Sequence, residues 1–229
     1  MSSPIVNVRK RFLQKFLIWF HQNASHKHRI SILAELITCG IKTQVPKSEF
    51  INCLDVGCGD MVLAEKIAEN LRNSNWRCTD IHPLPSALEG NAKWKKYSQF
   101  DGKHIPFQDK SFDVVAFCDV LHHAGENTGE LLTESARIAR IIIIKDHFED
   151  GIYSRTMLQL MDFMGNWAYG VNIPKKYFTR ESFAELCENA GLELVHLNDN
   201  IQLYKHLPLV RNILSPKWQF VATLRSKPV

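Results

Sequence analysis

The sequence predicts an α/β fold in which helices cover both faces of a doubly wound, mostly parallel sheet. From residue 50 onward, short apolar runs alternate with segments of helical periodicity, which is the pattern of repeated strand–helix units. One of these runs, Ile141–Lys145, is apolar up to its last residue, as expected for a strand buried on both faces. The chain has 229 residues, 45% of them hydrophobic, which is enough for one domain with a large core.

Each strand of this alternating part is expected where a short apolar run ends in a polar or turn-forming residue. The expected strands cover residues 50–56, 77–81, 94–100, 112–118, 141–145, 192–197 and 218–224. Helical spacing of apolar residues predicts helices over 62–71, 128–139, 152–164 and 181–190. Gly191 follows the last of these as a C-cap.

Two helices are expected before the first strand, over residues 9–22 and 27–39. The first 34 residues contain six basic residues and no acidic one, and the remaining chain contains 22 basic and 24 acidic residues. Phe12, Phe16 and Phe20 share one face of the first helix, so it either caps the domain or contacts an anionic membrane surface weakly. A secretory signal fits poorly because polar residues interrupt the apolar run, whereas a transit peptide remains an alternative.

The composition excludes several classes of protein. Beyond residue 34 the chain is close to neutral, which argues against a nucleic-acid partner. No run reaches the roughly 18 apolar residues of a membrane-spanning helix. The six cysteines form no CxxC pair, which indicates reduced thiols in a cytoplasmic protein. None of the ten histidines forms an HExxH or HxxxH pair beside a carboxylate, so no metal site is expected.

Carboxylates mark the ends of the first four expected strands, at Asp55, Asp80, Asp101 and Asp119. In an open parallel sheet, ligands bind beyond the carboxyl ends of the strands. Gly57 and Gly59 would let the chain turn tightly after the first strand, close to a bound molecule. Asp80 follows Gly59 by 21 residues, the spacing at which a carboxylate accepts the hydroxyl groups of a ribose.

The glycine turn does not fit a dinucleotide. The third glycine of GxGxxG is absent, and Asp60 would repel a pyrophosphate. A ligand with a ribose, an adenine and a cationic amino-acid tail suits these acids better. S-adenosylmethionine has these parts, including a sulfonium and an ammonium group.

Four motifs in order resemble those of the class I S-adenosylmethionine-dependent methyltransferases, and more narrowly those of a large bacterial small-molecule group. LDVGCG, D-A-x-x-L-P-F, S-F-D-x-V and L-H-H correspond to Leu54–Gly59, Asp101–Phe107, Ser111–Val115 and Leu121–His123. The chain departs from the pattern at Met61, where the family often has a third glycine. The resemblance covers about residues 50–146. It implies a seven-stranded Rossmann-like sheet with its last strand antiparallel, and S-adenosylmethionine as cofactor.

The resemblance also implies a role for each matched residue. The methionine part of the cofactor would be held by Asp55, Gly57 and Gly59. Asp80 would bind the ribose hydroxyls, and Ile81 would pack on the adenine. Asp101 would accept a hydrogen bond from the adenine amino group, with Gly102 giving close backbone approach. Cys118 and Asp119 would close the site beneath the sulfonium.

Methyl transfer needs a general base only for some acceptors, and no triad is present. His147 and His123 are the candidate bases, although each has an ordinary structural explanation. Residues 147–178 are too long for a simple connection and rich in aromatic residues, which predicts a lid over a small apolar or aromatic acceptor with an O, N or C nucleophile. The expected organisation is N-terminal cap helices over 1–45 and a methyltransferase domain over 46–229.

Two other functions remain open from the sequence. A protein or RNA methyltransferase could share this fold, although the (N/D)PPY motif of base amino-group methylation is missing after the fourth strand. A non-catalytic cofactor-binding or scaffold protein could also share it. Intact Gly57, Gly59, Asp80 and Asp101 argue against that reading, because such a protein has no chemical need for them.

Overall fold

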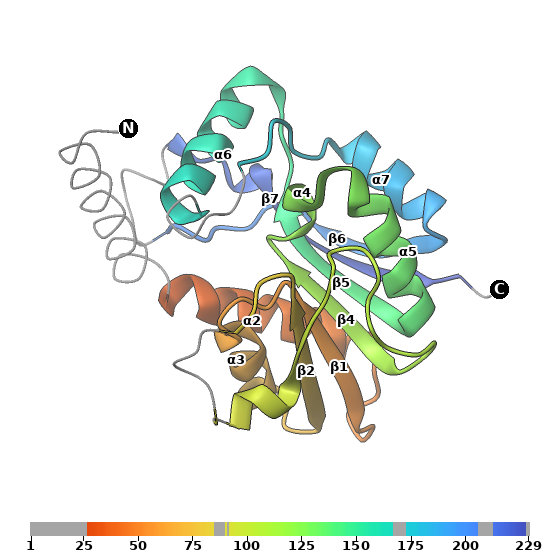
Figure 1. Ribbon diagram of the computed structural model, residues 1–229. Helices are drawn as coiled ribbons and strands as arrows, with labels where there is room; N and C mark the ends of the chain where they lie inside the picture. The colour runs from red at the N-terminus through yellow and green to blue at the C-terminus, as the bar shows by residue number, and fades with distance from the viewer. Residues whose placement is uncertain (1–26, 85–89, 91, 167–172, 206–212, 228–229) are drawn as a thin grey trace, which may run out of the picture.

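The computed structural model describes residues 27–84, 90, 92–166, 173–205 and 213–227. The helix expected over 9–22 lies outside these residues. The seven strands form one sheet in the order β3-β2-β1-β4-β5-β7-β6 (Figure 1). They are β1 Ile51–Val56, β2 Ser74–Asp80, β3 Tyr97–Gln99, β4 Phe112–Cys118, β5 Ala139–His147, β6 Leu192–Asn198 and β7 Gln219–Ser226. Only β7 runs antiparallel to its neighbours, so the expected doubly wound α/β sheet is confirmed.

Helices cover both faces of this sheet. The α-helices are α2 Lys27–Lys42, α3 Val62–Asn70, α4 Leu121–Ala124, α5 Thr128–Ile138, α6 Gly151–Asn166 and α7 Arg180–Asn189. Short 3-10 turns are η3 Ala92–Lys96, η4 Gly125–Asn127 and η6 Pro216–Trp218. Figure 1 shows α2 and α3 on one side of the sheet and α5 and α7 on the other. Within the described ranges, no helix is long and apolar enough to cross a membrane.

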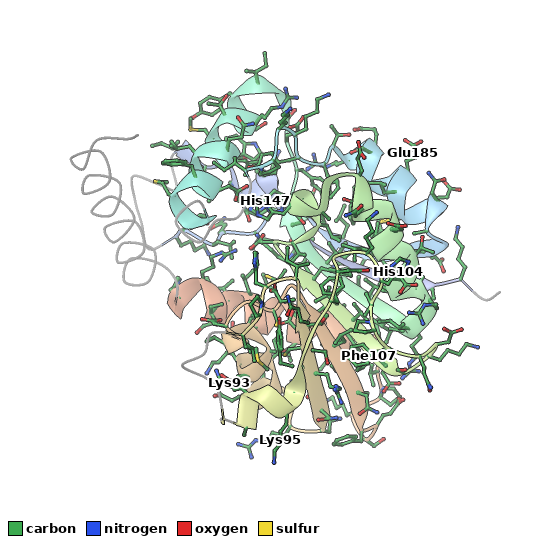
Figure 2. All side chains as sticks on the ribbon, in the orientation of Figure 1. Lys93, Lys95, His104, Phe107, His147 and Glu185 are labelled. Atoms are coloured by element: carbon green, nitrogen blue, oxygen red, sulfur yellow. The ribbon has the colours of Figure 1, made fainter. Side chains whose placement is uncertain are left out.

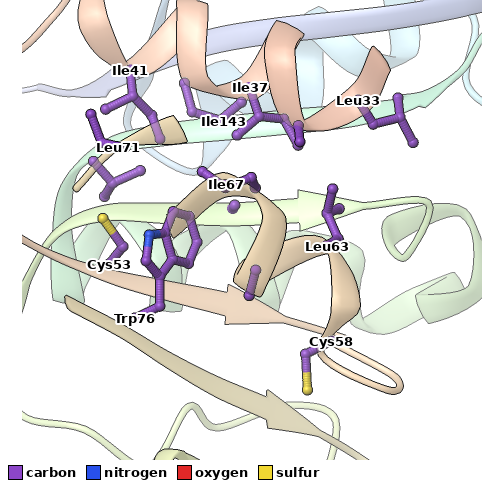
Figure 3. Close-up of a cluster of buried hydrophobic side chains, with 14 of the residues drawn as sticks. Leu33, Ile37, Ile41, Cys53, Cys58, Leu63, Ile67, Leu71, Trp76 and Ile143 are labelled. Atoms are coloured by element: carbon purple, nitrogen blue, oxygen red, sulfur yellow. The ribbon is translucent and has the colours of Figure 1, made fainter. Parts of the chain in front are cut away.

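Alternate residues of the central strands enter two separate cores, because successive side chains of a strand point to opposite faces. Cys53, Val114 and Ile143 face α2 and α3, where Figure 3 shows Ile37 of α2 and Ile67 of α3 packing in the same cluster. The intervening residues, among them Leu54, Val115 and Ile144, face α5 and α7. Because Ile37 has no solvent exposure, α2 is a core helix of the sheet domain.

The largest differences from the expected strand boundaries are in β3, β2 and β5. The strand expected over 94–100 is limited to Tyr97–Gln99, because the lysine-rich segment before it forms η3 and the edge strand pairs only with the last three residues of β2. β2 begins at Ser74, three residues early, since polar Ser74 and Asn75 still pair with β1. β5 is longer at both ends, so Asp146 and His147 belong to the strand rather than follow it.

Candidate functional site

The carboxyl ends of the parallel strands meet at one edge of the sheet, and the candidate residues lie there. β1 and β2 carry Asp55 and Asp80, and the chain leaving β4 carries Asp119. His147 ends β5 on the side of the sheet where α6 lies (Figure 2). The topology therefore brings the sequence-predicted residues of four different strands to one edge, as expected for an open parallel sheet.

The turn after β1 is fastened to the end of β2. The backbone N–H groups of Gly57 and Cys58 donate to the carbonyl of Thr79 at 2.8 and 3.2 Å. Gly59 N donates to Asp80 Oδ2 at 2.9 Å. Gly57 has φ +75°, and a Cβ atom there would lie 2.3 Å from a methyl carbon of Val120, so only glycine fits this turn.

Met61 continues this turn in a conformation that glycine would adopt more easily. It precedes α3 with φ +67° in the left-handed region, and its side chain is buried in the core on the α2–α3 face. A glycine, which the resembling family often has at this position, would adopt this conformation without strain. The left-handed conformation of a residue with a Cβ costs about 1–2 kcal/mol.

Asp55 is a buried carboxylate with one oxygen that is unpaired in the described part of the chain. Asp55 is 2% exposed to solvent, and no described residue donates a hydrogen bond to its Oδ2. Burial, reinforced by the negative charges of Asp80 and Asp60, raises the pKa of Asp55 to about 7. A positive ligand group beside it would stabilise the charged form. This region of the turn therefore fits the cationic methionine portion of S-adenosylmethionine.

The expected adenosine contacts lie at the ends of β2 and β3. Asp80 Oδ1 accepts a hydrogen bond from His82 N at 3.0 Å, and Asp80 Oδ2 accepts the hydrogen bond from Gly59 N. These two bonds fix the orientation of the carboxylate. Each oxygen keeps a further lone pair that can accept a hydrogen bond from a hydroxyl group. Ile81 is apolar but 50% exposed, and a Cβ on Gly102 would lie 3.2 Å from its Cγ2. The two residues thus form one surface open to a flat ring.

Asp101 lies in the loop after β3 and is exposed. The N–H groups of His104 and Lys103 donate to its Oδ1 at 2.8 Å each, and they lower the pKa of Asp101 to about 2. The carboxylate is therefore charged and held in one orientation. Oδ2 faces His104 Nδ1 at 3.3 Å.

Asp119 is the centre of an ion-pair network that the sequence did not reveal. It follows Cys118 directly, with φ +57°, and its carboxylate pairs with Arg29 of α2 and with Lys145 of β5. Lys145 has no solvent exposure, and burial together with the charge of Arg29 lowers its pKa to about 7. The network ties the end of β4 to a helix 90 residues earlier in the chain.

His147 is buried beside this network. Its Nε2 lies 3.4 Å from Lys145 Nζ, and its Nδ1 has no hydrogen-bond partner among the described residues. Burial and the neighbouring Lys145 lower the pKa of His147 to about 3. The ring is therefore neutral at physiological pH, and its Nδ1 lies 3.5 Å from Oδ1 of Asp119 and from Oδ1 of Asp146.

A second histidine, His122, is enclosed by two carboxylates. Its Nδ1 lies 2.5 Å from Asp146 Oδ1, and its Nε2 lies 3.5 Å from Asp162 Oδ2 of α6. Burial opposes a charge on His122, but the two carboxylates outweigh it and raise the pKa to about 9. Tyr177 donates its hydroxyl hydrogen to Asp162. The second candidate base, His123, is adjacent, with its ring centroid 4.0 Å from that of His122.

Sequence reasoning missed the roles of Arg29, Asp146, Asp162 and Tyr177 at this end of the sheet. Arg29 and Asp162 come from helices far away in the chain, so no local spacing could reveal them. The one available signal was the pair Asp146-His147 at the end of a buried apolar strand. A cavity of about 240 Å³ lies elsewhere, at the opposite edge between α7 and β6, lined by residues such as Phe183 and Leu192.

Residues 54–141 match the model of a family described as a methyltransferase domain. Among solved structures, the CurJ carbon methyltransferase is similar with a TM-score of 0.58 and 17% identity, covering 87% of this chain and 54% of that one. This chain thus spans about half the length of that protein. A chain in the complex between the Haloferax volcanii Trm112 methyltransferase activator and a methyltransferase has a TM-score of 0.60 and 14% identity, with 94% of each chain covered.

An S-adenosylmethionine-dependent methyltransferase from Mesorhizobium loti has a TM-score of 0.59 and 11% identity, covering 82% of this chain and 96% of that one. At these identities the structural similarity shows the fold. No curated protein sequence matches the chain. Residues 54–141, which include the glycine turn and the carboxylates at the strand ends, therefore match a methyltransferase domain, and they lie in the seven-stranded sheet described above.

Proposed function

We propose that this protein transfers a methyl group from S-adenosylmethionine to a small apolar or aromatic acceptor, bound where β4 and β5 end beneath α6. The observation that carries the cofactor part is Asp55, a fully buried carboxylate whose Oδ2 has no donor among the described residues. A buried carboxylate without a donor is costly unless a cation approaches it. In this proposal the cofactor ammonium is that cation, with Gly57 and Gly59 giving it room.

The remaining cofactor contacts follow from the geometry of the same edge. Asp80 binds the ribose hydroxyls, Ile81 and Gly102 form the surface under the adenine, and the oriented Asp101 accepts from the adenine amino group. Cys118 and Asp119 border the position of the sulfonium. Asp119 does so as part of an ion pair with Arg29 and Lys145, so it adds little net negative charge there.

The cofactor supplies a methyl carbon that is already activated by the sulfonium. The main task of the protein is then to align the acceptor and exclude water, a contribution of up to about 7–11 kcal/mol. His147 is the first candidate to accept a proton from an acceptor hydroxyl, because it ends β5 at this edge of the sheet and is neutral at physiological pH. His123 is the second candidate for that role.

The described part of α6 carries apolar surface, which would suit an apolar acceptor bound beside it. Four of its apolar side chains are exposed: Ile152, Tyr153, Leu160 and Met164. The aromatic residues of 147–178, which are expected to form a lid, divide into three groups. Tyr153 and Phe163 of α6 are exposed and half-buried, respectively. Phe148, Tyr177 and Phe178 are buried and serve the core, whereas Trp167 and Tyr169 lie outside the described residues.

Calorimetry with S-adenosylhomocysteine and with NADH tests the cofactor assignment. Binding of the first and not of the second is expected. Asp80→Ala should weaken that binding by about 1.5–3 kcal/mol, the loss of hydrogen bonds to a charged group, and Glu193→Gln at the opposite edge of the sheet serves as the control. A change of less than twofold in Asp80→Ala would contradict its role as the ribose ligand.

A panel of small acceptors, proteins and RNA, assayed by formation of S-adenosylhomocysteine, tests the acceptor class. Turnover with small apolar or aromatic compounds is expected. Turnover with protein or RNA alone would overturn the acceptor part of the proposal while leaving the cofactor part intact. Cofactor binding with no turnover on any acceptor would favour the non-catalytic alternative.

A further inference from the structure

We propose that His122, His123 and Asp162 form a binding site for a divalent transition-metal ion, close to the end of β5. The ligand atoms of these three residues lie within 4.8 Å of one another. They come from the start of α4 and from the middle of α6, two elements separated by about 40 positions in the sequence. Sequence spacing alone excluded such a site, because HExxH and HxxxH motifs detect only ligands on one helix.

Asp146 fixes the orientation and the tautomer of His122. Its Oδ1 accepts from His122 Nδ1 at 2.5 Å and from His147 N at 2.7 Å, and its Oδ2 lies 3.3 Å from His122 N. Both oxygens of Asp146 therefore already accept hydrogen bonds. In this site Asp146 orients His122 and does not itself bind the metal ion. Metal binding requires Nε2 to lose its hydrogen, and with the remaining hydrogen on Nδ1 the lone pair of His122 would lie on Nε2, the arrangement found when a carboxylate supports a metal-binding histidine.

Nε2 of His122 is the observation that points to a ligand. The side chain has no solvent exposure, and Nε2 has no hydrogen-bond partner in the described structure. It lies 3.5 Å from Asp162 Oδ2, which is too long for a hydrogen bond. Two atoms that each coordinate Zn²⁺ at about 2.0–2.1 Å with a tetrahedral angle are separated by about 3.3–3.5 Å. The observed spacing is that of two ligands around one ion.

The chemistry of the set fits a divalent ion. Two imidazoles and one carboxylate are ligands that Zn²⁺ accepts and that Fe²⁺ also uses. Asp162 is supported by the hydroxyl of Tyr177, just as His122 is supported by Asp146. Asp146 and Asp162 also place two negative charges around one imidazole, which a divalent ion would neutralise. A proton on His122 Nε2 is the competing occupant.

Three protein ligands leave at least one coordination position open, which is typical of catalytic rather than structural metal sites. A hydroxyl oxygen of the acceptor bound at this position would lose its proton more easily. This step rests on the proposed function, whereas metal binding itself does not. If the acceptor binds the metal ion in this way, His123 acts as a metal ligand, and His147 remains the residue that takes the proton from the acceptor.

Metal binding is tested on the full-length protein after treatment with a chelator. Titration with Zn²⁺ by calorimetry should give one ion per chain, and titration with Co²⁺ should produce the visible absorption of a coordinated ion. Asp162→Asn and His122→Gln should each weaken Zn²⁺ binding by more than about 100-fold, and Asp146→Asn by about 10–100-fold, as for residues that support a ligand. His196→Ala on β6, whose side chain is exposed, is the matched control and should bind Zn²⁺ like the wild type.

Circular dichroism and thermal unfolding show whether each variant is folded, and Asp162→Asn keeps the test valid if His122→Gln does not fold. The absence of Zn²⁺ and Co²⁺ binding in the wild type overturns the proposal. So does equal binding in the wild type and in folded Asp162→Asn. If ¹⁵N NMR shows both nitrogens of His122 protonated and unaffected by Zn²⁺, the proton is the occupant. Calorimetry with S-adenosylhomocysteine on the same metal-free protein reports separately on the proposed function.

Discussion

At the scale of single residues, Asp55 couples the stability of the free protein to the binding of a cation. Its pKa is about 7 in the folded chain and about 3.8 when unfolded, so the folded protein holds more protons between these values. Stability contributed by the neutral carboxyl is therefore complete below about pH 4 and is lost as the pH rises toward 7. A cationic ligand favours the charged form, so cofactor binding has the opposite pH dependence.

Two measurements on Asp55→Asn follow from this coupling. For the wild type, affinity for S-adenosylmethionine should increase as the pH is raised from 5.5 to 8, because binding releases the proton of Asp55 near pH 7. The variant should bind weakly with little pH dependence, and at pH 8 its free form should unfold at a higher temperature than the wild type. A wild-type affinity that does not change over this range would contradict the contact between Asp55 and the ligand cation.

Met61 allows strain and burial to be compared at one position. Substitution by glycine removes about 1–2 kcal/mol of left-handed strain but also removes a buried side chain, which costs about 2–5 kcal/mol. Met61→Gly should therefore lower the free energy of unfolding in urea. Lys110 has φ +56° but is exposed, so Lys110→Gly should raise stability by up to about 1 kcal/mol. Stabilisation of Met61→Gly would show that strain dominates there.

At the scale of elements, α6 is held over the site by a few polar contacts. Glu149, just after β5, accepts from Arg155 Nη2 and Nε at 2.6 and 2.8 Å and from Tyr177 N at 3.0 Å. Removing the carboxylate leaves these donors without their acceptor, so Glu149→Ala should reduce the free energy of unfolding by about 1–3 kcal/mol. Hydrogen exchange should increase first in α6. The exposed Glu185→Ala is the control, with an expected change within about 0.5 kcal/mol.

The same elements show what a sequence can reveal about this fold and site. Apolar runs such as Ile141–Lys145 predicted the central strands, because burial on both faces requires continuous apolar residues. The lysine-rich segment before Tyr97 looked like a strand, since its edge position was not visible in the pattern. The proposed cofactor residues could be assigned to one edge of the sheet because each lies at or after the end of a strand in the sequence. The contact of His122 with Asp162 was not, because α6 folds back over the sheet through tertiary packing alone.

At the scale of the whole molecule, α2 connects the N-terminal part of the chain to the site. Its apolar face, including Ile37 and Ile41, is buried in the sheet core, whereas Arg29 near its first turn pairs with Asp119 at the carboxyl edge. α2 therefore begins close to the proposed acceptor position. This placement favours the proposal that residues 9–22 cap the acceptor over the alternative that they contact a membrane.

A protein that starts at Gln22 separates these two alternatives. The truncation leaves α2 complete, so the unfolding temperature and the affinity for S-adenosylhomocysteine should stay close to those of the full chain. A cap predicts a large loss of turnover on a soluble acceptor, with unchanged binding to vesicles containing anionic lipid. A membrane contact predicts full turnover and lost vesicle binding, because each basic residue near an anionic surface contributes about 1 kcal/mol. Full turnover together with unchanged vesicle binding would contradict both, and the four basic residues that the truncation removes would then act neither at the site nor at a membrane.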